Sequence, residues 1–275
     1  MIKIEEKFKE LSSRGEGAYM PHIYYGDPFP RFSRREVEIL AENGADFIEF
    51  GVPFSDPIAD GSTFQEACQR ALENDITPED CIRGIEKLRE DGLSIPIIVT
   101  SYYNILYAYG MDDFLERLNE AGAQGIIVPD IPIEEVNSLA KAGRKKDIHV
   151  ILQATPNTSK NRLRKIINTT SGFLYIVNFE GVTGTKRSIP NSTIDMINKV
   201  KNLSHMPLMA GFGVSTKNHA KSLVSAGVDG VITGSALRKI YGKDLNNPKE
   251  KMSDIAEFAR QMKKGCEEGY EKRTL

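Results

Sequence analysis

The chain has 275 residues, of which 40% are hydrophobic and 27% are charged, a balance that is typical of a folded globular protein and excludes disorder as its main state. Its 36 basic and 38 acidic side chains give a net charge of −2, which provides no bulk field for nucleic acid or an anionic membrane. No apolar run approaches the roughly 20 residues of a membrane span, and the N-terminal residues alternate in charge unlike a secretion signal. We therefore expect a cytoplasmic protein with no nucleic-acid or membrane partner.

The histidines and cysteines do not form a metal-binding or redox motif. Four histidines and three cysteines are scattered along the chain. No CxxC pair or HExxH helix provides the spacing that zinc binding or thiol exchange requires. We therefore expect no metal site.

Short runs rich in β-branched residues alternate with longer stretches of helical period along the chain. An amphipathic segment at residues 2–11 comes first. The pattern then predicts strands at residues 19–24, 47–51, 95–100, 125–128, 150–153, 173–177, 208–211 and 230–233. Helices are expected at residues 33–43, 64–73, 77–91, 111–120, 134–145, 160–168, 192–201, 217–224 and 254–265, with a short extra helix at 235–240.

Several of these strands are apolar at every position, as expected when helices bury both faces of a parallel sheet. The repeated strand–helix units predict an α/β fold, a (β/α)₈ TIM barrel with an added N-terminal helix, formed by residues 1–275 as a single domain. Similar helix–glycine–strand junctions at residues 42–48, 120–126 and 225–231 support the repeat. A doubly wound open sheet is the alternative, because one sequence does not reveal strand order. Residues 267–275 are expected to form a solvated tail.

The strongest catalytic candidate is a single carboxylate near the end of an apolar strand. In a barrel of this kind the loops after the strands build the active site, and Glu49 would lie at that end among apolar residues. Burial would raise the pKa of Glu49 toward a value suited to general acid–base catalysis. A structural ion pair is the alternative role. Asp56 and Asp60 follow in a loop rich in Pro and Gly, where Asp is also common as a turn former.

Glycine-rich segments follow the last three predicted strands, at residues 181–184, 211–214 and 234–236. Glycines at the ends of strands allow backbone N–H groups to approach an anion, and the N-terminus of a helix at 235–240 would add donors and a favourable dipole. Loops at this position in barrels commonly bind phosphate. These segments therefore predict a phosphate site, with ordinary tight turns as the alternative.

The sequence resembles the tryptophan synthase alpha chain family over nearly its whole length. The resemblance rests on residues 49–61, which are close to that family's signature, and on motifs at residues 26–28, 102–104, 128–132, 181–184, 211–214 and 234–236. It implies a lyase that cleaves indole-3-glycerol phosphate to indole and glyceraldehyde 3-phosphate, with no cofactor on this chain. The implied partner is a pyridoxal-phosphate-dependent β chain, which receives the indole within a heterotetramer.

The family's pattern also implies roles for individual residues. Glu49 would be the general acid/base, Asp60 would hold the indole N–H, and Tyr175 would line the pocket. The other implied substrate-binding positions are His22, Thr100, Tyr102, Ile127, Gln153, Thr183, Gly184, Phe212, Gly213, Gly234 and Ser235. Retro-aldol cleavage requires a proton on the ring carbon, removal of the carbinol proton and an anion near the ring nitrogen, and two carboxylates meet these needs without a cofactor.

Three of these positions depart from what the family leads us to expect. His22 stands where a large apolar residue is usual, and Thr100 and Gln153 stand where aliphatic side chains are usual. Together they would form a polar arc opposite the carboxylates, which is poorly matched to an indole ring because buried polar groups without partners cost free energy. The alternative is that one or more of them faces a neighbouring loop or is satisfied by backbone groups.

Three hypotheses about function follow. The leading one is the alpha chain of a bifunctional tryptophan synthase, with the β chain docked on residues 53–60 and around Asn104. The second is a free-standing, related lyase that acts on a more polar aryl or heteroaryl glycerol phosphate. The third is a non-catalytic partner that only activates a β chain, which the presence of Glu49, Asp60 and the phosphate loops disfavours.

Overall fold

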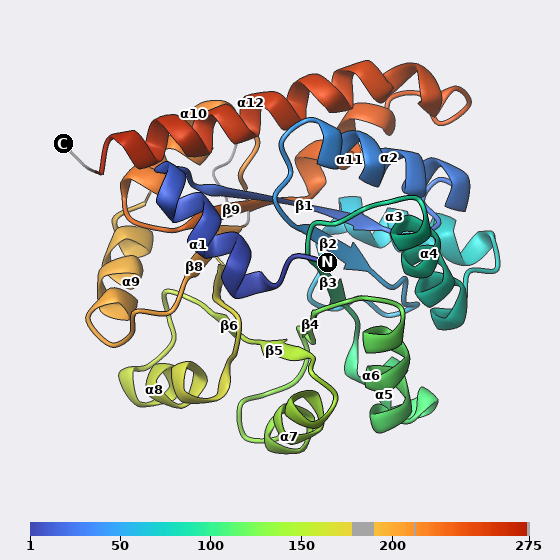
Figure 1. The fold of residues 1–275 in the computed structure, drawn as a ribbon. Coiled ribbons are helices and arrows are strands. Elements are labelled where there is room, and N and C mark those ends of the chain that lie inside the picture. Colours follow the sequence, from blue (N-terminus) through green and yellow to red (C-terminus); the bar gives the residue numbers. More distant parts are fainter. Residues whose placement is uncertain (178–189, 212, 274–275) are drawn as a thin grey trace.

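The computed structural model describes residues 1–177, 190–211 and 213–273, which form a barrel of parallel strands surrounded by helices (Figure 1). The strands run in the order β5-β4-β3-β2-β1-β9-β8-β7-β6. β5 and β6 are two parts of one barrel strand on either side of Leu152, so this order closes into a ring of eight, and the open-sheet alternative is wrong. The strands are β1 (Ala18–Tyr24), β2 (Ile48–Gly51), β3 (Ile97–Thr100), β4 (Gly125–Ile127), β5 (His149–Ile151), β6 (Gln153–Ala154), β7 (Leu174–Val177), β8 (Leu208–Gly211) and β9 (Gly230–Thr233).

The helices form the outer layer, and their apolar faces pack on the strands. They are α1 (Ile4–Arg14), α2 (Pro30–Glu42), α3 (Ser62–Glu73), α4 (Pro78–Glu90), α5 (Tyr103–Tyr109), α6 (Met111–Glu120), α7 (Asn137–Lys145), α8 (Lys160–Thr169), α9 (Asn191–Lys201), α10 (Lys217–Ser225), α11 (Ser235–Tyr241) and α12 (Met252–Glu271), with a 3₁₀ turn η1 (Pro248–Lys251). The predicted barrel is therefore confirmed.

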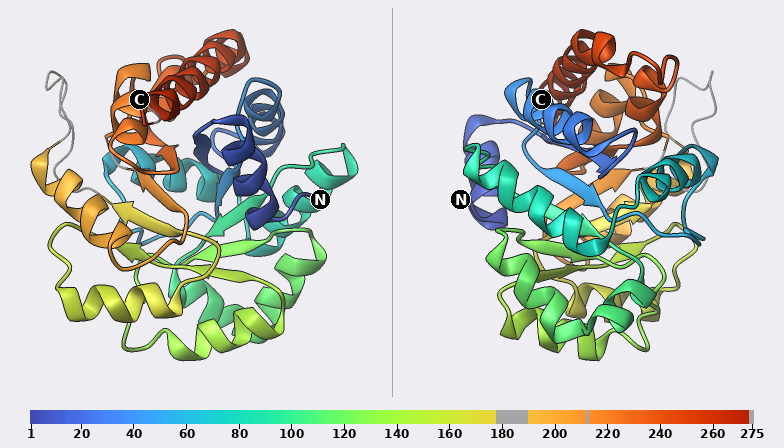
Figure 2. Two further views of the ribbon diagram at one scale, coloured as in Figure 1. Left: turned by 60° about the vertical axis from the view of Figure 1, so that its left-hand side comes forward. Right: turned by 90° about the vertical axis from the view of Figure 1, so that its right-hand side faces the viewer.

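Helix α1 covers the end of the barrel at which the strands begin. Its apolar residues recur at helical spacing, and Ile4, Phe8 and Leu11 belong to the cluster inside the barrel. The Phe8 ring lies 4.9 Å from that of Phe47 and 6.0 Å from that of Phe173. Figure 1 shows α1 across the centre of the ring of strands, and Figure 2 shows it at one end of the barrel. The added N-terminal helix closes this end of the barrel, so the interior is open only toward the opposite end, at which the strands finish.

Alternation along the strands decides which side chains enter the barrel. Residues two apart in a strand point to the same face. The interior positions include Met20 in β1 and Phe47 just before β2, which are apolar and belong to the interior cluster. They continue with His22 and Glu49 nearer the strand ends. The part of the barrel interior next to α1 is therefore a packed apolar core, and the polar side chains gather at the carboxyl end of the barrel.

The predicted solvated tail at residues 267–275 is wrong for its first part, because α12 continues to Glu271. Figure 1 shows α12 lying beside α10 over much of its length. Glu268 accepts a 2.6 Å hydrogen bond from Lys221, and the Gly269 carbonyl accepts one of 3.2 Å from Ser225. These contacts between distant segments, together with the fully buried Cys266, hold the end of the chain on the barrel.

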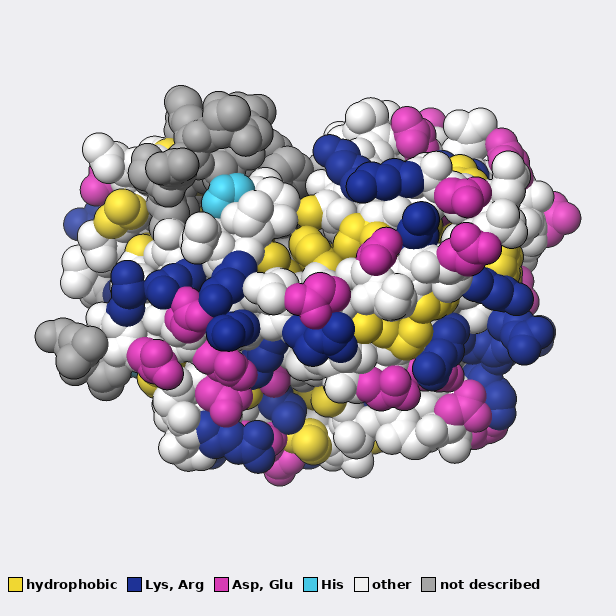
Figure 3. All heavy atoms as spheres, turned by 90° about the horizontal axis from the view of Figure 1, so that it is seen from above, with side chains coloured by type: hydrophobic (Ala, Val, Ile, Leu, Met, Phe, Trp, Pro, Cys, Tyr) yellow, Lys and Arg dark blue, Asp and Glu magenta, His cyan; other side chains and the backbone are white. Residues whose placement is uncertain are grey.

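Smaller differences concern the ends of elements. The expected helix at 134–145 begins only at Asn137, and the strand expected at 150–153 is divided at Leu152. Helix α5 was not among the expected elements. In the described ranges no helix is long and apolar enough to cross a membrane. On the face shown in Figure 3, basic and acidic side chains are interspersed, in keeping with the net charge of −2.

Candidate active site

A cavity of about 250 Å³ opens at the carboxyl end of the barrel, where the predicted site residues come together. Nine of the predicted positions line this one cavity: His22, Glu49, Asp60, Thr100, Gln153, Tyr175, Gly213, Gly234 and Ser235. They come from seven different strands or the loops after them, so only the closed barrel brings them together.

Glu49 is buried in the wall of the cavity, with 2% of its surface exposed. Its Oε1 accepts a 2.6 Å hydrogen bond from the Thr100 hydroxyl on the neighbouring strand β3, while its Oε2 is buried without a hydrogen-bond partner among the described residues. Burial raises the pKa of Glu49 to about 8, although the bond from Thr100 acts in the opposite direction. Glu49 is therefore mostly a neutral acid near pH 7, which is the form that can donate a proton.

His22 on strand β1 lies beside Glu49, its register partner on the neighbouring strand β2. Its Nδ1 is 3.4 Å from Oε1 of Glu49. Burial lowers the pKa of His22 to about 3, so this contact joins two uncharged groups near pH 7 and is not an ion pair. The imidazole also packs on the Phe64 ring, with 4.6 Å between centroids.

Asp60 lies across the cavity at the end of the loop between β2 and α3, and it is partly exposed. Two phenols hold its Oδ2, because Tyr24 donates a 2.6 Å hydrogen bond to it and Tyr102 one of 2.8 Å. Burial raises the pKa of Asp60, whereas both phenols favour its charged form. Since both bonds are made to Oδ2, the carboxylate is fixed in direction and Oδ1 is unengaged by the described residues.

Two glycines and the start of a helix form another part of the cavity wall. Gly213, which has a left-handed φ of +74°, lines it together with Gly234 and Ser235. A Cβ at Gly234 would overlap the ring of Phe64, so this position admits only glycine without a shift of Phe64. Ser235 begins helix α11, so that the first N–H groups of this helix lie at the wall of the cavity.

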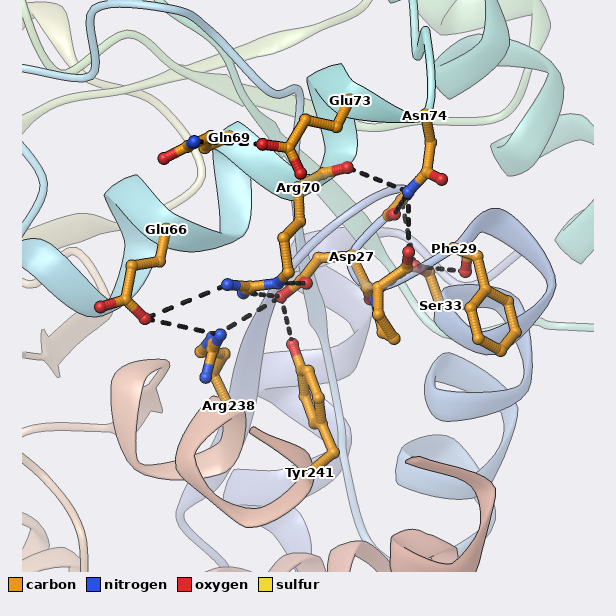
Figure 4. Close-up of polar contacts among 12 residues, drawn as sticks. Asp27, Phe29, Ser33, Glu66, Gln69, Arg70, Glu73, Asn74, Arg238 and Tyr241 are labelled. Atoms are coloured by element: carbon orange, nitrogen blue, oxygen red, sulfur yellow. Dashed lines mark hydrogen bonds and ion pairs between the residues drawn. The ribbon is translucent and has the colours of Figure 1, made fainter. Parts of the chain in front are cut away.

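A polar network behind the cavity connects three elements that carry site residues (Figure 4). At its centre is Asp27, fully buried in the loop after β1. Arg70 of α3 binds both carboxylate oxygens of Asp27, at 2.7 and 3.1 Å, and Tyr241 of α11 donates a 2.8 Å hydrogen bond to one of them. Arg238 of α11 lies 3.7 Å from Asp27 as well. Helix α3 follows Asp60 and helix α11 begins at Ser235. Asp27 therefore fixes the positions of these two helices, and of the cavity walls next to them, relative to each other.

The remaining predicted site residues lie at different places. Tyr102 contacts the site through Asp60, to which its hydroxyl donates a hydrogen bond. The same hydroxyl accepts a 3.1 Å hydrogen bond from the backbone N–H of Ala59. Ile127 is buried in the interior cluster and is not part of the cavity wall. Thr183, Gly184 and Phe212 lie outside the described residues.

Two residues that shape the site, Tyr24 and Phe64, are not among the predicted catalytic and substrate-binding positions. Tyr24 stands two residues after His22, so strand alternation placed it on the same interior face, and this signal could have been used. Phe64 lies in the first turn of α3 and reaches the cavity by packing on His22 and Tyr24. Nothing in the local pattern around Phe64 distinguishes it from an ordinary apolar residue of a helix.

A family model described as tryptophan synthase alpha chain matches residues 8–267. The chain belongs to the tryptophan synthase alpha chain family. It is 39% identical over 246 residues to the tryptophan synthase alpha chain of Methanocaldococcus jannaschii, which covers 90% of this chain and 87% of that protein. It is 40% identical over 257 residues to the one of Methanothermobacter thermautotrophicus, with 93% and 95% covered.

Solved structures of tryptophan synthase show the same fold. The subunit alpha from Legionella pneumophila superposes with a TM-score of 0.88 at 30% identity, covering 97% of this chain and 98% of that one. A chain of the tryptophan synthase complex from Pyrococcus furiosus superposes with a TM-score of 0.82 at 33% identity, covering 90% and 98%.

Membership of the tryptophan synthase alpha chain family does not favour the hypothesis of a lyase for a more polar ring. The structure supplies a physical reason, because two of the three polar side chains are directed at Glu49. Thr100 donates to the carboxyl group, so its hydroxyl requires no polar ring for a partner. His22 places Nδ1 beside the same group, whereas its Nε2 is buried without a hydrogen-bond partner among the described residues. Only Gln153 of the polar arc lines the cavity without such a contact to Glu49.

Proposed function

We propose that this chain cleaves indole-3-glycerol phosphate in a retro-aldol sense to indole and glyceraldehyde 3-phosphate. One observation carries the proposal: a buried carboxylic acid, Glu49, shares a cavity with a second carboxylate, Asp60, that two phenols hold in place. The two groups have different environments, which is the usual sign of separate acid–base duties. Membership of the tryptophan synthase alpha chain family supports this reaction.

In the proposed reaction, neutral Glu49 donates its proton to the ring carbon that bears the glycerol chain. The Asp60 carboxylate accepts the ring N–H and stabilises the positive charge that develops on the ring nitrogen. The carbinol O–H then returns a proton to the Glu49 carboxylate while the carbon–carbon bond breaks and its electron pair restores the aromatic ring. The products are indole and an aldehyde, and Glu49 ends in the acid form in which it began.

The substrate phosphate is proposed to bind at the glycine-lined end of the cavity. Backbone N–H groups near Gly213, Gly234 and Ser235 supply donors there, and the start of α11 adds a favourable dipole. Thr183, Gly184 and Phe212 stay predictions for the same site. The chemistry consists of proton transfer and charge stabilisation, so we expect no metal or cofactor on this chain; a cytoplasmic location also stays a prediction.

A pyridoxal-phosphate-dependent β chain is the proposed partner, and two observations support a docking surface beside the cavity. Ile58 in the loop 53–60 is 80% exposed and Tyr107 on α5 is 76% exposed, two of the few large hydrophobic side chains on the described surface. The loop adjoins α5, because the Tyr102 hydroxyl accepts a 3.1 Å hydrogen bond from Ala59 N–H. Asn104 on α5 is also exposed. A product could pass from this face to the partner.

The test is an assay of indole release from indole-3-glycerol phosphate by the purified chain, with and without a β chain. We expect cleavage by the chain alone, a higher rate with the β chain, and a loss of about 10²-fold or more in Glu49→Gln. The Glu49→Gln protein should keep its thermal transition and its affinity for glycerol phosphate. Release by neither preparation would contradict the proposed activity, and release only with the β chain would favour a chain that needs its partner.

A further inference from the structure

Glu49 has two oxygens with very different surroundings. Oε1 receives the Thr100 hydroxyl at 2.6 Å and has His22 Nδ1 at 3.4 Å, whereas Oε2 is buried without any hydrogen bond among the described residues. A buried carboxyl oxygen without a partner is costly in a resting protein, so its presence in the wall of the cavity requires an explanation. The different surroundings therefore point to different roles for the two oxygens of Glu49.

We propose, building on the function proposed above, that Thr100 and His22 are positioning residues which anchor Oε1 of Glu49 so that Oε2 exchanges the proton with the substrate. In the neutral acid the proton lies on Oε2, because Oε1 already accepts a bond from Thr100. Oε1 then serves as the carbonyl oxygen, which has two lone pairs and can accept from both neighbours. This assignment requires the Nδ1–H tautomer of His22.

The fold supports a fixed arrangement of these three side chains. His22 and Glu49 are directly paired between β1 and β2, and Thr100 ends the next strand, β3. All three are buried, and the His22 ring is held by packing on Phe64 and Tyr24. Anchoring one oxygen restricts the rotation of the carboxyl group, so the proton stays in one direction relative to the substrate.

A Thr100→Val substitution removes the hydroxyl while it keeps the shape of the side chain. We expect kcat for cleavage of indole-3-glycerol phosphate to fall about tenfold, as for the loss of one buried hydrogen bond to an ionisable group, with KM changed less than about twofold. Thr100→Ser keeps the hydroxyl and should restore most of kcat. A merely structural role would affect stability and not this split between kcat and KM.

The pH profile gives a second readout. The Thr100 hydroxyl favours the charged form of Glu49, so its removal should move the alkaline limb of the kcat profile upward by roughly one pH unit. The other ionisable groups that face Glu49 are His22 from β1, Asp60 from the loop after β2 and Tyr175 from β7, and Thr100→Val leaves all three in place. His22→Phe should lower kcat less than Thr100→Val does, because its contact is longer.

Thr193 provides a matched control. It is fully buried in α9, and its hydroxyl has no hydrogen-bond partner among the described residues. Thr193→Val therefore makes the same change in a buried side chain outside the site, and it should leave kcat and the pH profile unchanged. Thermal unfolding of every variant shows whether it folds. If Thr100→Val does not fold, Thr100→Ala takes its place, since it also lacks the hydroxyl.

A measurement without substrate separates this proposal from the proposed function. In protein labelled with ¹³C at the glutamate carboxyl carbon, the signal absent from Glu49→Gln is that of Glu49, and its titration reports the carboxyl group directly. We expect a titration at higher pH in Thr100→Val than in Thr100→Ser or the unmodified protein. Equal titration midpoints and equal kcat in all three would overturn the proposal, even if the protein cleaves its substrate. A shifted midpoint would support it even if no cleavage were found.

Discussion

Tyr241 donates a 2.8 Å hydrogen bond to Oδ2 of Asp27, which joins helix α11 to the loop after β1. Arg70 of α3 binds the same carboxylate through two nitrogens, and Asp27 is fully buried. A buried carboxylate that accepts several hydrogen bonds is held in a narrow range of positions. Asp27 thereby connects α11, which begins at Ser235, to α3, which follows Asp60.

Removal of the Tyr241 hydroxyl tests this link. We expect Tyr241→Phe to lower the free energy of unfolding by about 1 kcal/mol, as for the loss of one typical intramolecular hydrogen bond, and to raise KM several-fold with a smaller change in kcat. Tyr109→Phe is the control, since it removes a 2.7 Å bond to Glu79 away from the cavity. Steady-state kinetics of both variants measure the changes in KM and kcat, and thermal melts measure the change in stability. An equal rise of KM in the two variants would argue against a specific role for the Asp27 network.

Gly234 is required because Phe64 occupies the space that a Cβ would take. We expect Gly234→Ala to displace the Phe64 ring, disturb the packing on His22 and raise KM for the phosphorylated substrate by about tenfold or more, since overpacking of a filled site costs roughly 1–3 kcal/mol. The double change Gly234→Ala with Phe64→Leu should recover part of this loss. If the double variant binds no better than Gly234→Ala alone, contact with Phe64 does not explain the glycine.

The raised pKa of Glu49 determines the pH dependence of activity. With a pKa of about 8, the proton-donating form is lost as pH rises through 8, so kcat should fall on the alkaline side of that value. The pKa of His22 is lowered to about 3, and we therefore expect no inflection near pH 6.5 from this histidine. A profile measured from pH 5 to 10 tests both statements. A limb centred near pH 4.5 would instead indicate a carboxylate that acts only as a base.

The raised pKa of Glu49 also makes the stability of the protein depend on pH. The folded protein keeps a proton on Glu49 up to about pH 8, whereas the unfolded chain loses it near 4.5. The folded form therefore binds more protons between these values, and this group's contribution to the free energy of unfolding decreases as pH rises, by at most about 1.4 kcal/mol per pH unit. Denaturant titrations of the unmodified protein and Glu49→Gln from pH 5 to 8 should show the free energy of unfolding of the unmodified protein falling relative to that of the variant as pH rises. A constant difference would mean that the pKa of Glu49 is not raised.

The docking surface can be tested with charged substitutions. Ile58→Asp and Tyr107→Asp place a charge on two exposed apolar side chains and should leave folding unchanged. We expect each to weaken binding of a cognate β chain by about tenfold or more in sedimentation experiments, as for the loss of an apolar anchor. Leu245→Asp, another exposed apolar position, serves as the control. Equal binding by all three would place the interface elsewhere.

Local patterns in the sequence determined the repeat of strands and helices and the position of Glu49 near the end of an apolar strand. Strand alternation and helical period are properties of neighbouring residues, so they can be read without the fold. They also predict that His22, Glu49 and Thr100 end up at the same end of the barrel. The glycines around 234 could likewise be assigned to a strand end.

Only the tertiary structure decided which of these polar groups meet. Thr100 bonds to Glu49, and Tyr24 and Tyr102 bond to Asp60, because the register and closure of the barrel bring together residues from separate strands and loops. The burial of the chain's end at Gly269 and the Asp27 network with Arg70 and Tyr241 depend equally on contacts between segments distant in sequence. Such contacts leave no periodic signal, since each depends on where the whole chain places two side chains and not on either residue's neighbours.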